Sequence, residues 1–263
     1  MIRIVQAITP VHVGEGQTVG SVDLPIARER HTGLPTVPGT SLKGALRSRC
    51  RRLGAPPERV REVFGSEPGQ IPLSRGEVSI SDAALIALSV RCLARGAALL
   101  TSPLLLGRLA RWLDDAPPIP RTSVERAKAA DHTDFVVPEL DRVVLEDLDL
   151  LVETDEAVGV WAEAMARWLG DDAPLDRLLL VHDDVLAFAA EAWIPIRTRA
   201  SIDADGVVRD GHLFTVEALP PESLLFTIVR GHDQRLLPPD GEVFTVGGHA
   251  TIGSGRMAWY GGR

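Results

Sequence analysis

Two glycine-rich loops lie near opposite ends of the 263-residue chain, and each adjoins groups that could hold phosphate. The first covers residues 12–20, and the second covers residues 247–255 and leads into Arg256. Glycines let a backbone come close to a ligand, while a guanidinium neutralises phosphate charge. The first loop is one residue longer than the dinucleotide-binding pattern G-x-G-x-x-G, and no P-loop motif surrounds Lys43. Either loop alone also fits a tight turn, but two of them beside a basic helix indicate a long polyanion.

Asp23 is the carboxylate with the best placement for chemistry, because it lies between the first loop and Arg28. An isolated aspartate is most often a turn or cap residue, but beside phosphate-binding groups it could hold a divalent metal. His12 has two similar interpretations: a loop histidine bonded to backbone, or a side chain that contacts a base or phosphate. The histidines lack H-x-x-x-H and H-E-x-x-H spacing, and no G-x-S-x-G occurs, which argues against a zinc site and a serine hydrolase.

A basic helix is predicted between the two loops. Thr40 or Ser41 is expected to cap its N-terminus, and Gly54 is expected to end it. Basic residues recur every four positions along it and therefore share one face: Lys43, Arg47 and Arg51. The helix N-terminus and this face would both favour an anionic partner.

Charge is distributed unevenly along the chain, whose net charge is −8. Residues 27–61 hold nine Lys/Arg and two Glu, a balance of +7, whereas residues 131–191 hold three Arg and seventeen Asp/Glu, a balance of −14. A polyanion would bind the first segment and be repelled by the second. For the acidic segment, a solvated face is the preferred interpretation.

The remaining pattern predicts alternating strands and helices. Residues 84–113 are expected to be mostly helical and residues 114–150 irregular, and residues 197–214 should form a hairpin with Asp205-Gly206 at its turn. A helix is also expected at residues 158–169, and strands at residues 2–8, 77–81, 178–181 and 224–229. Residues 243–257 are expected to form a strand, a glycine-rich turn and a final strand.

The composition is that of a globular protein, with 45% hydrophobic and 24% charged residues. No stretch approaches the roughly 20 apolar residues of a membrane span, and the N-terminus does not read as a signal peptide. The two cysteines, Cys50 and Cys92, have no C-x-x-C spacing and fit a reducing cytosol, so a cytoplasmic location is expected.

Three motifs carry a resemblance to a known family. Residues 9–16 read T-P-V-H-V-G-E-G, residues 22–35 read V-D-L-P-I-A-R-E-R-H-T-G-L-P, and residues 38–47 read P-G-T-S-L-K-G-A-L-R. With the loop at residues 247–255, they closely resemble the repeating backbone subunit of type III-B CRISPR (Cmr) effector complexes, a member of the RAMP superfamily. The resemblance runs from end to end of the chain.

The resemblance implies an α+β fold in a single domain. It would have a modified RRM-like, ferredoxin-like β-α-β core at about residues 1–90 and 178–263, and a helical insertion at about 91–177. The hairpin at about 197–214 would be a protruding thumb. Copies would stack in a helical filament along a guide crRNA, together with other Cmr subunits. No membrane partner is expected. They would cleave the target RNA where the thumb flips nucleotides out, through attack by the adjacent 2′-hydroxyl.

The resemblance also implies roles for individual residues. Asp23 would be the catalytic residue and would hold Mg²⁺ or Mn²⁺, with His12 and Glu217 as further catalytic residues. Ala218 stands where the family often has a tyrosine. The implied RNA-binding residues are Arg28, Ser41, Lys43, Arg47, Gly247, Gly248, Gly253, Ser254, Gly255 and Arg256.

Three alternatives remain open from the sequence. The first is a scaffold subunit that binds RNA without cleaving it, with Asp23 as a cap residue. The second is an enzyme of small phosphate compounds with a closed nucleotide pocket, which the loop spacings disfavour. The third is the homologous subunit of another type III subtype, although residues 32–35, T-G-L-P, favour the III-B form.

Overall fold

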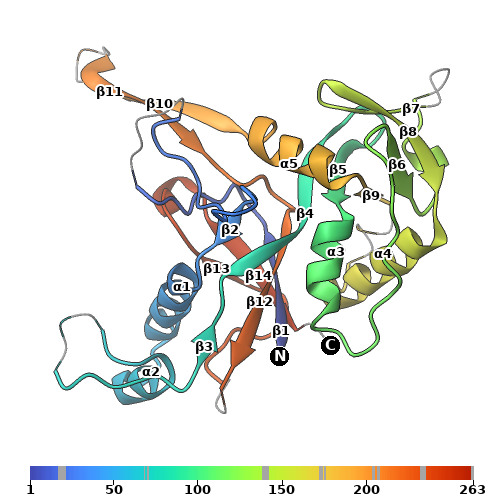
Figure 1. The fold of residues 1–263 in the computed structure, drawn as a ribbon. Helices are drawn as coiled ribbons and strands as arrows, with labels where there is room; N and C mark the ends of the chain where they lie inside the picture. The colour runs from blue at the N-terminus through green and yellow to red at the C-terminus, as the bar shows by residue number, and fades with distance from the viewer. Residues whose placement is uncertain are drawn as a thin grey trace.

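The chain folds into a mixed α/β structure in which helices cover both faces of an extended sheet (Figure 1). The computed structural model describes residues 1–16, 22–67, 69, 71–137, 142–171, 174, 176–202, 205, 208–231 and 235–261. The helices are α1 (Gly39–Arg52), α2 (Pro57–Phe64), α3 (Pro103–Ala110), α4 (Glu156–Leu169) and α5 (Asp183–Ala192), with 3₁₀ turns η1 (His132–Asp134) and η2 (Ala250–Ile252). The strands are β1 (Ile2–Ala7), β2 (Thr36–Val37), β3 (Ser79–Ile80), β4 (Ala83–Cys92), β5 (Gly96–Thr101), β6 (Arg126–Ala129), β7 (Arg142–Leu145), β8 (Leu148–Thr154), β9 (Leu178–Leu180), β10 (Ile196–Ile202), β11 (Val208–Glu217), β12 (Leu224–Arg230), β13 (Glu242–Thr245) and β14 (Arg256–Gly261).

Among the described residues, twelve strands belong to one sheet, with the order β13-β14-β1-β12-β4-β5-β9-β6-β8-β7 and with β2 and β3 beside it. The first five strands are antiparallel neighbours, and β1 lies between β12 and β14. A further pairing joins β4 to β7, where Cys92 lies opposite Leu145. This pairing brings the far end of the path back to β4, so the second half of the sheet has a barrel-like arrangement.

Strands β1, β12 and β4 contribute side chains to a core on each face of the sheet. Val5, Leu85 and Leu225 belong to the core that includes α1 and α2, whereas Ile4 and Phe226 belong to the core that includes α3 and α4. Side chains alternate between the two faces of a strand, so β1 fills both cores at once. The mixed α/β class is confirmed, while the RRM-like description of the first half of the sheet stays a prediction.

The expectation of a mostly helical segment at residues 84–113 is wrong. The structure has β4 and β5 there, and only α3 is helical. A strand buried on both faces is an almost unbroken apolar run, which cannot be distinguished from a buried helix by periodicity. The expectation of irregular structure at residues 114–150 is also wrong, because β6, β7 and β8 begin there. The insertion at residues 91–177 is therefore mixed rather than helical, and the sequence reading missed α2 and α5.

Several other elements are confirmed. The chain opens with β1, and the described strands β9, β12, β13 and β14 lie where strands were expected, although β3 is only two residues long. Helix α4 ends at Gly170, whose φ of 62° is left-handed. The hairpin pairs β10 with β11 in a separate two-stranded sheet that reaches away from the body (Figure 1). Gly206, at its predicted turn, lies outside the described residues.

The predicted N-cap of the basic helix is wrong. Helix α1 follows Pro38 and has no side-chain cap from Thr40 or Ser41. Instead, Oδ1 of Asp82 accepts a hydrogen bond of 2.7 Å from the backbone N–H of Gly39. The C-terminal prediction is confirmed, because Gly54 follows the helix with a φ of 76°.

We expect the fold to lose stability in acid because Arg49 of α1 forms an ion pair with Glu242 of β13. The hydrogen bond from Arg49 holds the pKa of the Glu242 carboxyl below its ordinary 4.5. The unfolded chain then binds more protons than the folded one. The contribution of this ion pair to the free energy of unfolding is therefore complete above pH 4.5, and it disappears as the pH falls through the folded-state pKa of Glu242. Urea unfolding from pH 7 to pH 3 measures it, with Glu242→Gln as the comparison. An equal pH dependence in both proteins would contradict the assignment.

Within the described part of the chain, no helix is long and apolar enough to cross a membrane. Cys50 and Cys92 are both buried as free thiols.

Candidate nucleic-acid interface

The segment around Asp23 lies along the base of the β10–β11 hairpin. Leu24 pairs in parallel with Val216 of β11. The N–H of Leu24 donates to the carbonyl of Thr215, and the N–H of Glu217 donates to the carbonyl of Leu24, each at 3.0 Å. The segment therefore extends the hairpin by a third short strand, which places Asp23 beside β11.

Thr215 fixes the Asp23 carboxylate. Oδ2 of Asp23 accepts hydrogen bonds from the backbone N–H of Thr215 at 2.7 Å and from its hydroxyl at 2.8 Å. These bonds, the backbone one first, hold the pKa of Asp23 below its ordinary 3.8. The residue is exposed, and Oδ1 makes no hydrogen bond with the described residues. Asp23 thus presents one ionised oxygen in a fixed orientation.

His12 is bound to the same strand two residues further along. Its Nδ1 lies 2.8 Å from the carbonyl oxygen of Glu217, which can only accept, so Nδ1 carries the proton. The side chain is buried, and a Cβ at Gly14 would lie 2.9 Å from its Nε2. The structure therefore brings Asp23 and His12 to one strand, and Gly14 leaves room for the ring.

Glu217 and Arg28 are paired with each other. The buried Glu217 carboxylate accepts from the N–H of Ile26 at 2.9 Å and from Nη2 of Arg28. Nη1 of Arg28 donates to the carbonyls of Gly33 and Ala190, each at 2.8 Å. These bonds join β11, the Asp23 segment and α5. The implied catalytic role of Glu217 and RNA-binding role of Arg28 stay predictions, and the contacts of both side chains support a positioning role.

The two glycine loops pack directly on each other. The N–H of Gly248 donates to the carbonyl of His12 at 2.9 Å, and the N–H of Gly255 donates to that of Pro10 at 2.9 Å. Gly247 has a φ of 79°, and a Cβ there would lie 2.1 Å from the His12 carbonyl oxygen, so only glycine fits. The described start of the first loop and the second loop therefore lie side by side next to the hairpin base.

The other predicted loop residues differ in their accessibility. Gly247, Gly248 and Arg256 are exposed, whereas Ser254 and Gly255 are buried. Gly253, with a φ of 84°, has no atom within 4 Å of a Cβ placed on it. The exposed positions are the ones that a ligand could reach.

The sequence reading missed His249 and Arg199. The His249 ring centroid lies 5.4 Å from that of His12. Burial, the positive charge of Arg199 and the nearby His12 lower the pKa of His249. Nε of Arg199, on β10, is buried without a hydrogen-bond partner among the described residues. The position of His249 between the predicted glycines was a signal that could have found it, whereas nothing local in the sequence singled out Arg199.

The predicted residues of α1 do not join this cluster. Arg47 donates to the carbonyl of Phe64 at 2.6 Å, and Arg51 forms an ion pair with Glu67. Ser41 and Lys43 are half-buried, and no hydrogen bond between described residues connects either to the hairpin base. Of the predicted basic face, Arg51 is therefore neutralised by a carboxylate and Arg47 is tied to the backbone, whereas Lys43 keeps its charge unpaired within the described residues.

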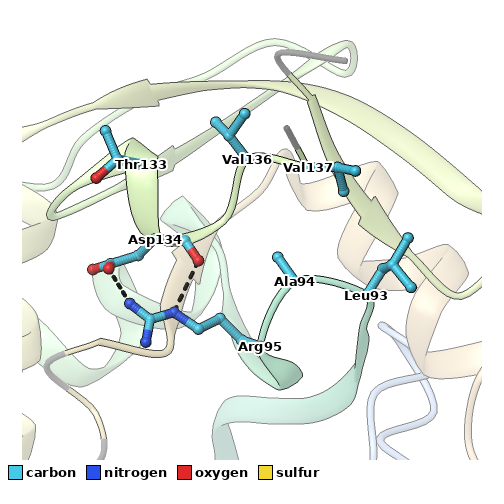
Figure 2. A pocket seen from close by; sticks show the side chains of 7 residues that line it. All are labelled: Leu93, Ala94, Arg95, Thr133, Asp134, Val136 and Val137. Carbon is cyan, nitrogen blue, oxygen red and sulfur yellow. Dashed lines mark hydrogen bonds and ion pairs between the residues drawn. The ribbon is translucent and has the colours of Figure 1, made fainter. Parts of the chain in front are cut away.

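A separate cavity of about 420 Å³ lies between the β4–β5 turn and the segment after η1 (Figure 2). Arg95 donates through Nε to the carbonyl of Asp134 at 2.8 Å and forms an ion pair with its carboxylate. Leu93, Val136 and Val137 supply apolar lining. The charged groups of this cavity are thus paired with each other. The cavity therefore does not match the closed nucleotide pocket expected for an enzyme of small phosphate compounds.

Comparison with known proteins decides the family. The sequence pattern of the RAMP superfamily matches residues 4–258. The chain belongs to the RAMP superfamily. A curated relative, the CRISPR system Cmr endoribonuclease Cmr4 of Pyrococcus furiosus, is 30% identical over 270 residues, which cover 94% of this chain and 90% of the relative. The match therefore spans nearly the whole of both proteins.

Solved structures agree with this membership. The crystal structure of oligomeric Cmr4 from Pyrococcus furiosus matches with a TM-score of 0.74 at 25% identity, covering 98% of this chain and 96% of that one. A chain in the type III-B Cmr-beta complex bound to cognate target RNA matches with a TM-score of 0.76 at 21% identity, covering 98% and 95%, and shows the shared fold. The resemblance that the motifs carried is confirmed.

A second relative matches a shorter part of the chain. The CRISPR system Cms endoribonuclease Csm3 of Enterococcus italicus is 34% identical over 95 residues, which cover 30% of this chain and 44% of the relative. The Cmr4 match extends over three times as much of the chain, 94% against 30%. The chain is therefore similar along nearly its whole length to the Cmr relative, and over less than a third of it to the Cms relative.

Proposed function

We propose that this chain is the repeating backbone subunit of a type III-B effector complex, that it lines a guide crRNA with further copies of itself and other Cmr subunits, and that it cleaves complementary target RNA at regular intervals. The observation that carries the proposal is the ionised Asp23 carboxylate, fixed at the hairpin base by Thr215. The relative that matches 94% of the chain is named an endoribonuclease, which supports the same reaction class.

The proposed reaction uses the RNA as its own nucleophile. The target 2′-hydroxyl loses its proton and its oxygen forms a bond to the adjacent phosphorus. The bond from phosphorus to the 5′-oxygen breaks, and this oxygen takes up a proton. The products are a 2′,3′-cyclic phosphate and a 5′-hydroxyl. Such a reaction needs alignment of the 2′-oxygen with the leaving oxygen and stabilisation of charge, not a protein nucleophile.

The residues at the hairpin base suit this task. Thr215 holds Asp23 in one orientation at the point where the thumb leaves the body, and the low pKa of Asp23 keeps it ionised at neutral pH. His12 and the glycine loops form the adjoining surface. We propose that the hairpin displaces target nucleotides, so that the scissile step is aligned next to Asp23.

The donor set fits a divalent cation. Asp23 keeps Oδ1 free of hydrogen bonds with the described residues, and Mg²⁺ is commonly bound by one or two carboxylates together with substrate phosphates and water. No cluster of three or more His, Cys, Asp or Glu side chains suited to a metal occurs among the described residues. We therefore propose Asp23 as the protein ligand of Mg²⁺ or Mn²⁺, which would neutralise charge at the phosphate.

The test is cleavage of labelled target RNA by the complex reconstituted with guide RNA and the other Cmr subunits. We expect regularly spaced products from a complementary target, none from a non-complementary one, and none when EDTA removes divalent cations. A complex that binds its complementary target and leaves it intact in Mg²⁺ and in Mn²⁺ would show that the chain is an RNA-binding scaffold.

A further inference from the structure

A second polar cavity, of about 500 Å³, lies between α1, the segment that leads into β3 and the end of β12. Three cationic side chains from three different elements line it. Lys43 comes from α1, Arg75 comes from the segment before β3, and Arg230 comes from the end of β12. Only Lys43 belongs to the motifs that pointed to RNA binding.

The three cations are not neutralised within the described part of the chain. The side chains of Lys43, Arg75 and Arg230 make no hydrogen bond or ion pair there, whereas those of Arg47, Arg49 and Arg51 of the same helix all have partners. Among the described lining residues, Glu77 supplies the single carboxylate, so their formal balance is three positive charges and one negative. Burial lowers the pKa of Lys43, and the positive charges of Arg47 and Arg75 lower it further.

The wall of the cavity is a fixed structure. Arg230 pairs with Ser79 in the β3–β12 ladder, and the N–H of Glu77 donates to the carbonyl of Glu62 at 3.0 Å. A Cβ at Gly231, which has a φ of 142°, would lie 2.5 Å from the carbonyl oxygen of Glu77. The backbone approach at Gly231 therefore holds the β12 end, with Arg230, against the segment that carries Arg75.

We propose that this cavity binds a backbone phosphate of RNA through Lys43, Arg75 and Arg230. The inference rests on the proposed RNA-binding function and adds two contact residues and a position to it. Unpaired cations that converge from separate elements disfavour each other unless an anion lies between them. Arg75 and Arg230 are exposed and Lys43 is half-buried, so a strand passing over the opening would reach all three side chains.

The experiment measures how salt weakens binding of the full-length chain to labelled single-stranded RNA. The three cations share one phosphate, so loss of that contact in the double variant Arg75→Gln/Arg230→Gln should lower the slope of log K against log salt by about 0.7. The matched control is Arg111→Gln, which removes an exposed arginine after α3 that has no side-chain partner in the described structure. We expect its slope to equal that of the wild type. Thermal unfolding checks that all variants are folded, and the single variants replace the double one if it is not.

The outcomes separate this inference from the function on which it rests. A wild-type chain that binds no RNA would contradict the proposed function itself. Wild-type binding with an unchanged slope in the Arg75/Arg230 variants would overturn only the cavity assignment. Inorganic phosphate is the second probe, compared with chloride at equal ionic strength. The remaining outcome is that phosphate raises the unfolding temperature of the wild type but not that of the Arg75/Arg230 variant, while the salt dependence of RNA binding is the same in both. That combination would assign the cavity to a small phosphate compound and overturn the RNA site.

Discussion

Asp23→Asn in every copy of the chain should reduce target cleavage by the assembled complex at least about 100-fold, while target binding stays within about twofold. Loss of one group that stabilises developing charge typically costs 100- to 1,000-fold in rate. Asparagine keeps the size of the side chain and an acceptor for the N–H of Thr215, so the hairpin base should remain in place. The variant removes only the charge. Product formation on a denaturing gel and target retention in a gel shift are the two measurements.

The chain provides a matched control for this variant. Asp131 has the same local arrangement, since its Oδ1 accepts from the N–H of Thr133 at 2.9 Å and from its hydroxyl at 2.8 Å. Those bonds lower the pKa of Asp131 as the bonds from Thr215 lower that of Asp23. It lies in the acidic segment, far along the chain from the hairpin base. Asp131→Asn should leave cleavage unchanged. If both variants lost cleavage equally, the effect of Asp23→Asn would be due to folding and not to the lost charge at the hairpin base.

Glu217→Ala should lower the free energy of unfolding by about 3 kcal/mol, the usual cost of removing one partner from a buried ion pair. The Glu217 side chain is 7% exposed and that of Arg28 is 25% exposed, so the variant leaves a cation in a largely dry site. It also removes the acceptor of the Ile26 N–H. Urea unfolding measures the loss, and Arg28→Ala should show a comparable one with strong coupling in the double variant.

An exposed pair supplies the comparison for Glu217. Arg59 and Glu62 form an ion pair on α2 with side chains 39% and 52% exposed, so Glu62→Ala should cost less than about 1 kcal/mol. Glu217→Gln tests the role in cleavage, because glutamine can still accept from Ile26. A positioning role predicts partial activity in this variant. Cleavage as low as that of Asp23→Asn in a protein of normal stability would make Glu217 a catalytic residue instead.

The sequence indicated the site better than it indicated how the site is held. Asp23 and His12 were singled out by residue type and motif, and the structure places both against β11. What could not be predicted is that Thr215, 192 positions away, orients Asp23. The resemblance gave Arg28 an RNA-binding role, which stays a prediction, but it gave no sign that the side chain pairs with Glu217, 189 positions away. Pairings across such separations have no local signal.

The same distinction applies to the fold. Turns and helix ends depend on nearby residues, so Gly54, Gly170 and the hairpin were predictable. The cap of α1 comes from Asp82, 43 positions beyond Gly39, and no pattern near α1 contains that information. Strand β4 looked helical because burial on both faces removes the alternation that identifies a strand. The errors therefore fall where tertiary contacts decide the structure.

The most direct test of the central claim uses a target RNA with a single 2′-deoxyribose at one of the regularly spaced cleavage positions of the wild-type complex. We expect cleavage to disappear at that position alone, and we expect the other products to be unchanged and to carry a 2′,3′-cyclic phosphate and a 5′-hydroxyl. Undiminished cleavage at the deoxy position would contradict attack by the 2′-hydroxyl beside Asp23.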